Sequence, residues 1–214
     1  MERVILTPTL SRWPDSGAKR LIDVFGAVLL LVLALPLMGI VAVAIKLTSP
    51  GPVLFQQIRC GKDGRRFHVL KFRSMRHGRS HRGPGVTCSN DTRVTRVGRV
   101  LRKWKLDELP QLFNVIRGEM SLVGPRPDLP EYLDALPADQ RQVLHLKPGV
   151  TSIATLRFRN EEELLSRVPT EALTAYYIAN VLPQKTSMEL DYASQASLFS
   201  DVAVLLQTAV AIFQ

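Results

Sequence analysis

Cysteine is scarce in this chain, with Cys60 and Cys88 the only two among 214 residues. Two cysteines without metal-ligand spacing exclude a disulfide framework and a cysteine-based zinc site. The four histidines are scattered along the sequence and form no metal-binding cluster either. The sequence therefore predicts reduced thiols in a reducing compartment, with the body of the protein facing the cytosol.

Familiar nucleotide-binding and hydrolase motifs are also absent. The sequence contains no glycine-rich loop ending in Gly-Lys-Ser or Gly-Lys-Thr, no clear dinucleotide fingerprint and no nucleophile elbow. These absences argue against P-loop enzymes, Rossmann dehydrogenases and serine hydrolases. A length of 214 residues predicts one domain together with a membrane element.

Positive charge is concentrated in one part of the chain. Of the 28 lysines and arginines, 15 lie between Arg59 and Lys105, where only two acids occur, and the whole chain has a formal net charge of +9. One interpretation is a solvated face on anionic lipid, where each base adds about 1 kcal/mol. The other is a site for an anionic ligand. Aromatic residues are few in this segment, so we expect no nucleic acid to bind.

One long apolar run lies near the N-terminus. Residues 24–45 carry no charge, and as a straight helix they would be about 33 Å long, which is enough to cross a bilayer. Pro36 stands in the middle of the run, where its missing N–H forces a kink. Lys19 and Arg20 precede the run and Lys46 follows it.

Three membrane arrangements fit this pattern. Because positive residues tend to stay on the cytoplasmic side, bases on both flanks favour a bent, re-entrant helix that enters one leaflet and returns. A single span with a proline kink is an equal alternative on the charge pattern alone. A cleaved signal peptide, suggested by Ala42 and Ala44, is the weakest, because this small pair lies inside the apolar run.

The rest of the chain predicts a mainly helical α+β fold. Residues 53–58 and 66–72 are strand-like segments around two glycines and predict a hairpin. Apolar spacing over residues 92–104 predicts a helix with a separate basic face. Another helix is expected to start at Asp107, with Pro110 in its first turn. A loop is expected over residues 79–90, and further helices over residues 131–136, 138–146, 161–168, 171–182 and 198–213.

The adjacent carboxylates of Asp107 and Glu108 are the sharpest candidates for chemistry. They stand next to Arg102, Lys103 and Lys105. Helix capping is one explanation of the pair. The other is a division of labour, because neighbouring side chains on a helix point about 100° apart. One carboxylate would then attack phosphorus, while the other holds Mg²⁺ together with substrate phosphate oxygens.

Phosphate chemistry also needs cations that hold negative charge. Lys71 and Arg73 lie on a strand-like segment and are candidates for this role. Arg126 stands between two prolines in a rigid loop over residues 123–127, which fixes its guanidinium for bidentate phosphate contact. Each base taken singly is also explained as surface charge.

A resemblance to a known family covers about residues 17 to 210. The chain strongly resembles the bacterial sugar transferases, which are monotopic phosphoglycosyl transferases, above all in DTRVTRVGRVLRKWKLDELPQLFNVIRGEMSLVGPRP over residues 91–127. Other stretches carry the same likeness: KRLIDVFGAVLLLVLALPL, SPGPVLFQQIRCG, KFRSM and KPGVTSIATLRFRNEEELL. Their order and spacing together are highly specific.

The resemblance implies a fold and a location. After an N-terminal tail over residues 1–18, residues 19–47 would form a re-entrant membrane helix bent at Pro36. Residues 48–214 would form a catalytic domain with a small β element. The protein would be monotopic in the bacterial inner membrane, with this domain on the cytoplasmic face.

The resemblance also implies a two-step reaction and its residues. Asp107 would attack the sugar-linked phosphate of a UDP-sugar and release UMP, with Glu108 as its partner in binding or activation through Mg²⁺. A polyprenyl phosphate, typically undecaprenyl phosphate, would then take up the phospho-sugar, which is a first membrane step in polysaccharide or glycan synthesis. Matching positions assign phosphate contacts to Lys71, Arg102 and Arg126, and less closely to Arg73.

Two positions depart from the usual family pattern. Leu35 stands where many members have a serine before the helix-bending proline, and Ser152 stands where a glycine is usual. A catalytically altered family member is therefore one alternative, and a basic membrane-surface binding protein is the alternative outside enzymes. The expected partners are a UDP-sugar, polyprenyl phosphate and membrane lipid. The donor sugar, the pathway and a homodimer are left open.

Overall fold

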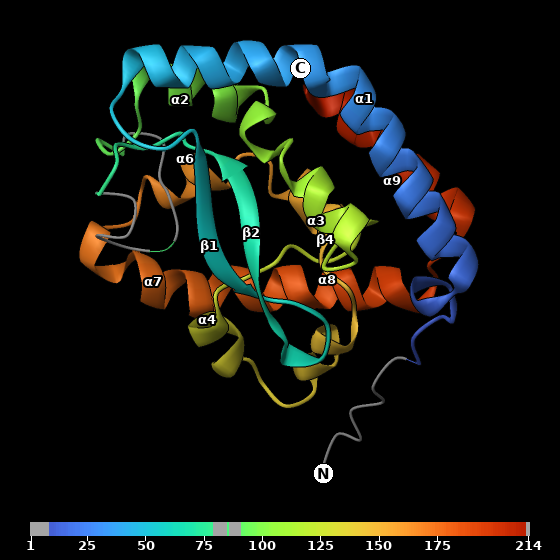
Figure 1. Ribbon diagram of the computed structural model, residues 1–214. Coiled ribbons are helices and arrows are strands. Elements are labelled where there is room, and N and C mark those ends of the chain that lie inside the picture. Colours follow the sequence, from blue (N-terminus) through green and yellow to red (C-terminus); the bar gives the residue numbers. More distant parts are fainter. Residues whose placement is uncertain (1–8, 79–84, 86–90, 213–214) are drawn as a thin grey trace.

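The computed structural model describes residues 9–78, 85 and 91–212, which form a mainly helical body with two small sheets (Figure 1). The predicted α+β class is thus confirmed. Apart from Gly85, the loop expected over residues 79–90 lies outside the described residues.

The apolar run forms one helix of 32 residues, α1 (Gly17–Thr48), after a 3₁₀ turn, η1 (Trp13–Asp15). Ser16 caps it, because its side chain accepts a hydrogen bond from the backbone nitrogen of Lys19 at 3.1 Å. The helix continues through Pro36, and Figure 1 shows it bent in its middle. The predicted long helix is confirmed. Pro36 does not end it, because the hydrogen bonds on both sides continue.

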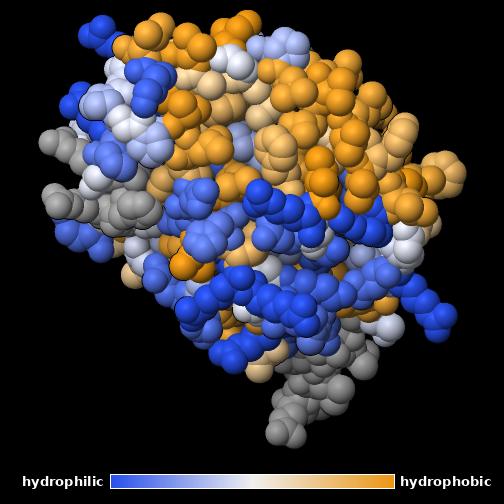
Figure 2. Space-filling model, viewed as in Figure 1, coloured by the Kyte–Doolittle hydropathy of each residue, from blue (hydrophilic) through white to orange (hydrophobic). Residues whose placement is uncertain are grey.

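One side of α1 packs on the body and the other is open. Ala27, Val41 and Ile45 are buried against α2, α3 and β3, whereas many apolar side chains on the outer side are exposed. Only 17% of the most apolar stretch of α1 is buried. Figure 2 shows these side chains as one hydrophobic surface over the top and side of the molecule.

Two separate pairs of strands lie beside α1. Strands β1 (Leu54–Cys60) and β2 (Arg66–Phe72) are antiparallel and confirm the predicted hairpin, whose turn is η2 (Lys62–Gly64). A second pair, β3 (Ser121–Val123) and β4 (Gly149–Thr151), is parallel. The sequence did not predict this pair, because each strand has three residues and the partners are far apart in the chain.

The helices around the acidic pair differ from the prediction. Helix α2 (Arg96–Lys103) begins later than expected. Its N-cap is Thr95, whose side chain accepts a hydrogen bond from the backbone nitrogen of Gly98 at 2.9 Å. No helix starts at Asp107. Lys105 has a left-handed φ of 54° and turns the chain into a 3₁₀ turn, η3 (Leu106–Glu108), and helix α3 (Gln111–Arg117) follows Pro110. The capping explanation of Asp107 is therefore wrong.

The C-terminal half is a succession of short helices and two longer ones. They are α4 (Pro130–Asp134), η4 (Gln140–His145), α5 (Ile153–Arg157), α6 (Glu161–Leu165), η5 (Thr170–Ala172), α7 (Leu173–Tyr176), η6 (Tyr177–Val181), α8 (Leu182–Ser194) and α9 (Leu198–Ile212). We expected a helix over residues 171–182 that ends before Pro183, and this end is wrong. A π-helical turn, η6, precedes that proline, and the chain continues as α8 with Pro183 in its first turn, where no N–H is needed.

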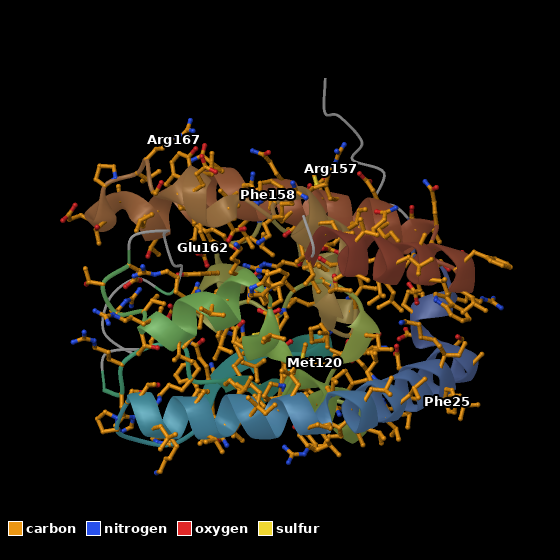
Figure 3. All side chains as sticks on the ribbon, turned by 90° about the horizontal axis from the view of Figure 1, so that it is seen from above. Phe25, Met120, Arg157, Phe158, Glu162 and Arg167 are labelled. Atoms are coloured by element: carbon orange, nitrogen blue, oxygen red, sulfur yellow. The ribbon has the colours of Figure 1, made fainter. Side chains whose placement is uncertain are left out.

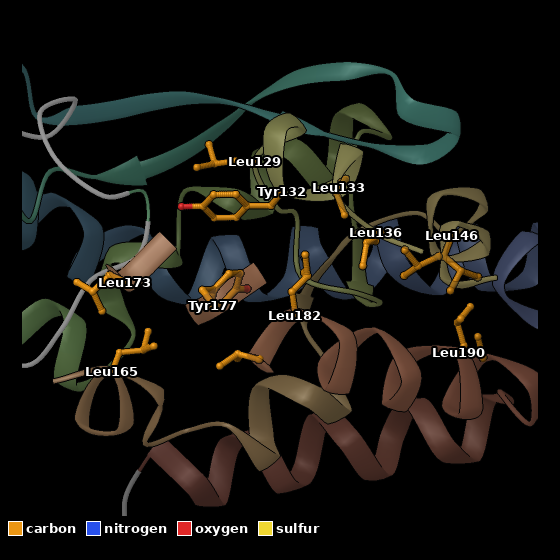
Figure 4. Packing of buried hydrophobic residues seen from close by; sticks show 13 residues of the cluster. Leu129, Tyr132, Leu133, Leu136, Leu146, Leu165, Leu173, Tyr177, Leu182 and Leu190 are labelled. Atoms are coloured by element: carbon orange, nitrogen blue, oxygen red, sulfur yellow. The ribbon is translucent and has the colours of Figure 1, made fainter. Parts of the chain in front are cut away.

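The largest hydrophobic cluster fixes the C-terminal half (Figure 4). It joins α4, α7, η6 and α8, and at its centre the rings of Tyr132 and Tyr177 lie 5.3 Å apart. Two smaller clusters join α1 to the hairpin, α2 and α3. The acidic pair thus lies between two packed parts of the fold.

Candidate active site

Asp107 and Glu108 lie at the wall of a large cleft. The cleft has a volume of ≈ 680 Å³ and is lined by β1, β2, α2, η3, residues 126–128, the segment from α5 to α6, η6 and α8. Both carboxylates are buried, with 7% of each residue exposed. This volume is within the range of about 300–1,000 Å³ that is usual for small-molecule sites.

Glu108 is held by two bases. Its Oε1 accepts a hydrogen bond from Nζ of Lys71 at 2.9 Å and from the guanidinium of Arg126 at 2.8 Å. Burial by itself would raise the pKa of Glu108, but the charges of Arg126, Lys71 and Lys105 outweigh it, and this pKa lies well below its usual value. Glu108 therefore stays ionised.

Asp107 differs from Glu108 both in its contacts and in the direction of its pKa shift. Among the residues that the structure describes, none donates a hydrogen bond to its buried Oδ1. Burial raises the pKa of Asp107 and the charge of Glu108 raises it further, while Lys71, Arg102 and Lys105 oppose the shift. Since a buried oxygen without a partner is costly, this carboxylate is poised for a ligand or a reacting atom.

The bases predicted from the sequence divide into two groups. Lys71 and Arg126 converge on Glu108, and Arg102 lines the same cleft, where it pairs with Glu162 of α6. Figure 3 shows Glu162 on the inner side of its segment. Burial lowers the pKa of Lys71, and the charge of Glu108 partly restores it.

Arg73 also lines the cleft, but its guanidinium serves the backbone. It donates to the carbonyl oxygens of Ser49, at 2.8 Å, and Pro50, just after α1. Gly51 follows with a φ of 116°, and an added Cβ there would lie 2.2 Å from Nη1 of Arg73. The role of Arg73 as a phosphate contact remains a prediction.

Asn114 was missed by the sequence reasoning, although it fixes the site. This fully buried side chain accepts from the backbone nitrogen of Leu70 at 3.0 Å and donates to the carbonyl of His68 at 2.8 Å and to Glu119 at 2.6 Å. It thereby joins α3, which follows the acidic pair, to the strand that carries Lys71. An asparagine at an apolar helix position was the signal for a buried bridge.

The far wall of the cleft was also missed. It contains four residues that are linked by hydrogen bonds: Asp128, Glu161, Tyr177 and Lys185. Only Asp128 had a sequence signal, because it follows the rigid loop of Arg126 directly. The other three are ordinary residues within segments of helical composition.

A buried polar network holds α1 and α9 together. Nζ of Lys19 lies 3.1 Å from Asp23 and 2.8 Å from Asp201, and Asp201 also accepts from Trp13 at 2.9 Å and from Tyr192 at 2.6 Å. Such a network costs stability if one partner is removed. It lies at the N-terminal end of α1, where it ties this helix to α9.

The acidic pair is suited to a metal ion only together with a ligand. Within residues 9–78, 85 and 91–212, no three His, Cys, Asp or Glu side chains are grouped to hold one. Mg²⁺, however, usually takes one or two carboxylates and completes its shell with substrate phosphates and water. The unpartnered Oδ1 of Asp107 fits such a site.

Comparisons with known proteins identify the family of the chain. A family profile described as bacterial sugar transferase matches residues 14–214. The UDP-glucose:undecaprenyl-phosphate glucose-1-phosphate transferase of Caulobacter vibrioides is 42% identical over 195 residues, which cover 89% of this chain and 67% of that protein. Proteins with the same name from Xanthomonas campestris and Escherichia coli are 40% and 35% identical over 90% and 91% of this chain, which spans only 38% and 41% of their lengths. The chain therefore belongs to the bacterial sugar transferase family.

Proposed function

We propose that this protein transfers a sugar phosphate from a UDP-sugar to a polyprenyl phosphate, through a covalent intermediate on Asp107. One observation carries the proposal: two adjacent buried carboxylates are held in opposite states. Oε1 of Glu108 accepts from Lys71 and Arg126, whereas no described residue donates to Oδ1 of Asp107, and both residues line the same cleft. The relatives from three bacteria are named as UDP-glucose:undecaprenyl-phosphate glucose-1-phosphate transferases, which supports the same substrates.

In the first step a carboxylate oxygen of Asp107 attacks the sugar-linked phosphorus of the donor. A bond forms between this oxygen and phosphorus, and the bond from phosphorus to the bridging oxygen breaks. UMP leaves with that electron pair. Lys71 and Arg126 hold Glu108 and present positive charge to the phosphates, and Arg102 adds a third base.

In the second step an oxygen of the polyprenyl phosphate attacks the same phosphorus. The bond from phosphorus to Asp107 breaks, the carboxylate is restored, and the product is a polyprenyl diphosphate sugar. Because both steps occur at one phosphorus, the basic side of the cleft can serve UMP first and the lipid phosphate afterwards. Asp107 and Glu108 would hold Mg²⁺ with substrate phosphate oxygens, and the ion would neutralise charge on the phosphates.

The apolar surface supports a membrane location for the acceptor. Phe25 and Leu33 of α1 are 74% and 69% exposed, and Figure 3 shows Phe25 pointing away from the body. We place this surface in the cytoplasmic leaflet, with α1 entering and leaving on the same side. Basic flanks at both ends and the bend in α1 favour this re-entrant arrangement over a span.

A basic membrane-surface binding protein is less well supported. Such a protein needs its bases directed outwards at anionic lipid. Lys71 and Arg126 instead point inwards at Glu108, and Arg102 is paired with Glu162.

The proposal is tested by UMP release from a panel of UDP-sugars, with Mg²⁺ and undecaprenyl phosphate. The comparison is between the parent, Asp107→Asn and the control Asp191→Asn, which changes an exposed aspartate on α8 outside the cleft. We expect release by the parent and the control and none above background by Asp107→Asn. Release by Asp107→Asn at the rate of the parent would refute the role of Asp107.

A further inference from the structure

The two ends of the cleft differ in chemistry. On the side of α2 the lining is basic, with Arg99, Arg102, Lys103 and Lys105. The opposite wall combines two carboxylates, a phenol, an ammonium group and an aromatic ring, from Asp128, Glu161, Tyr177, Lys185 and Phe158, and Arg59 lines the cleft beside Asp128. The steps proposed above use the basic side and leave the opposite wall without a role.

The groups of this wall fix one another in place. The hydroxyl of Tyr177 donates to Oδ1 of Asp128 at 3.2 Å, and Nζ of Lys185 donates to Glu161 at 2.7 Å and to the Tyr177 hydroxyl at 3.4 Å. Nζ of Lys185 also lies 5.4 Å from the centre of the Tyr177 ring and 5.9 Å from that of Phe158. Lys185 and Tyr177 are buried, so the surrounding side chains confine them. Asp128 and Glu161 are partly exposed to the cleft.

The local backbone sets the two buried groups on the same wall. Tyr177 is the first residue of the π-helical turn η6, and Lys185 follows in the first turns of α8. A π-helical turn is rare and is frequent at functional sites. It changes which side chains of a helix share a face. Here it brings Tyr177 and Lys185 together beside Asp128.

The wall lies beside Arg126, one of the two bases that hold the acidic pair. Arg126 is the base next to the acidic pair, and Asp128 is two residues further along the same rigid loop. Glu108 raises the pKa of Arg126 most, and Glu161 and Asp128 add to this effect, so both carboxylates are close to the guanidinium. Asp107 lines the same cleft.

The balance of charge and the hydrogen-bond acceptors decide which part of the donor fits the wall. Lys185 and Arg59 offset its two carboxylates, whereas the four bases on the side of α2 give that side a positive excess. Carboxylates repel a phosphate but accept hydrogen bonds from hydroxyl groups. The UMP part of the donor carries the second phosphate and is attracted to the basic side. The neutral ring attached to the reacting phosphate is left for the opposite wall.

We propose that Asp128 and Glu161 accept hydrogen bonds from hydroxyl groups of the donor sugar, and that this wall selects the sugar. Tyr177 and Lys185 act as positioning residues for the two carboxylates. The inference rests on the proposed transfer function and assigns its sugar subsite. A site built to hydrogen-bond a substrate hydroxyl discriminates strongly against an analogue that lacks it.

The test measures kcat/KM by UMP release for the best UDP-sugar and for its mono-deoxy analogues. The proteins compared are the parent, Asp128→Asn, Glu161→Gln and the control Glu163→Gln, which lies on the same helix but outside the cleft. Inhibition by UMP is measured alongside, since UMP contains ribose and uracil but no hexose. Melting temperatures show that each variant is folded.

We expect the preference of the parent for the intact sugar to fall roughly tenfold to a hundredfold in at least one of the two variants. Inhibition by UMP should stay within about twofold, and Glu163→Gln should behave as the parent. Tyr177→Phe, which keeps both carboxylates, should raise KM for the donor more than it lowers kcat.

Two results would overturn the sugar subsite alone. The first is folded, active variants that keep the preferences of the parent. The second is a loss of UMP inhibition that parallels the loss of donor use, which would assign the wall to the ribose. If the parent releases UMP from no donor, the proposed function itself fails, and the subsite with it.

Discussion

Asp107→Asn and Glu108→Gln each remove one negative charge from neighbouring, equally buried side chains with almost no change of volume. For Asp107 the charge destabilises the fold. Burial and Glu108 raise the pKa of Asp107, so above the pKa of the unfolded carboxyl the ionised group costs stability. Neutralising it should stabilise the protein by about 1 kcal/mol and raise Tm by roughly 2–4 °C.

For Glu108 the sign is reversed. Its pKa is lowered well below the usual value by Arg126, Lys71 and Lys105, so its charge stabilises the fold above the unfolded pKa, and this contribution is lost only as the pH falls through the folded value. Glu108→Gln leaves Lys71 and Arg126 without their carboxylate. We expect a loss of about 3 kcal/mol, and therefore a fall in Tm of roughly 6–12 °C.

Thermal unfolding followed by circular dichroism measures both effects. The protein should be in detergent near pH 7 with a chelator and without nucleotide, because a ligand shifts the apparent stability. Asp191→Asn serves as the control and should leave Tm nearly unchanged, since the side chain is exposed. Equal falls in Tm for Asp107→Asn and Glu108→Gln would refute the argument that the two carboxylates are held in opposite states.

Three further predictions follow from the same contacts. The kcat/KM for UMP release should fall on the acid side with an apparent pKa above that of an ordinary aspartate. The reason is that Asp107 must be ionised to attack, and burial and Glu108 raise its pKa. A pH profile of kcat/KM measures this. Arg126→Lys should lower kcat/KM by roughly tenfold to a hundredfold in steady-state assays, because an ammonium group lacks the planar fork of the guanidinium. Asn114→Ala should destabilise the protein by about 2–4 kcal/mol in denaturant unfolding, because it removes three hydrogen bonds of a buried side chain. The control Asn180→Ala, on the surface, should have little effect.

The elements with strong local signals could be predicted from the sequence. The long helix α1 followed from an uncharged run of 22 residues, and the hairpin followed from two strand-like segments around glycines. The family resemblance assigned phosphate contacts to Lys71 and Arg126, but it did not predict that both bases pair with Glu108. In the structure Oε1 of Glu108 accepts from both bases.

The parts that depend on distant contacts could not be predicted. The left-handed backbone of Lys105, which makes the turn that holds Asp107, has no glycine to mark it. The parallel pair β3 and β4 joins residues 28 positions apart. Helix α8 was not predicted, because a proline such as Pro183 usually ends a helix. In the structure the π-helical turn η6 comes before this proline, which therefore lies in the first turn of α8.

The backbone role of Arg73 was hidden for the same reason. A base on a strand next to Lys71 looks like a second phosphate contact, but only the fold brings Ser49 and Pro50 to its guanidinium. The far wall of the cleft is another such case, since Tyr177, Lys185 and Glu161 meet only after η6 and α8 have packed.

The covalent intermediate on Asp107 is tested most directly by mass spectrometry of the protein incubated with its donor sugar and Mg²⁺ but without polyprenyl phosphate. The account predicts that the parent gains one sugar phosphate on the peptide that contains Asp107, that the adduct is lost when polyprenyl phosphate is added, and that Asp107→Asn gains none. Release of UMP only when both substrates are present, with no adduct on the protein at any time, would contradict it and would indicate direct transfer from donor to acceptor.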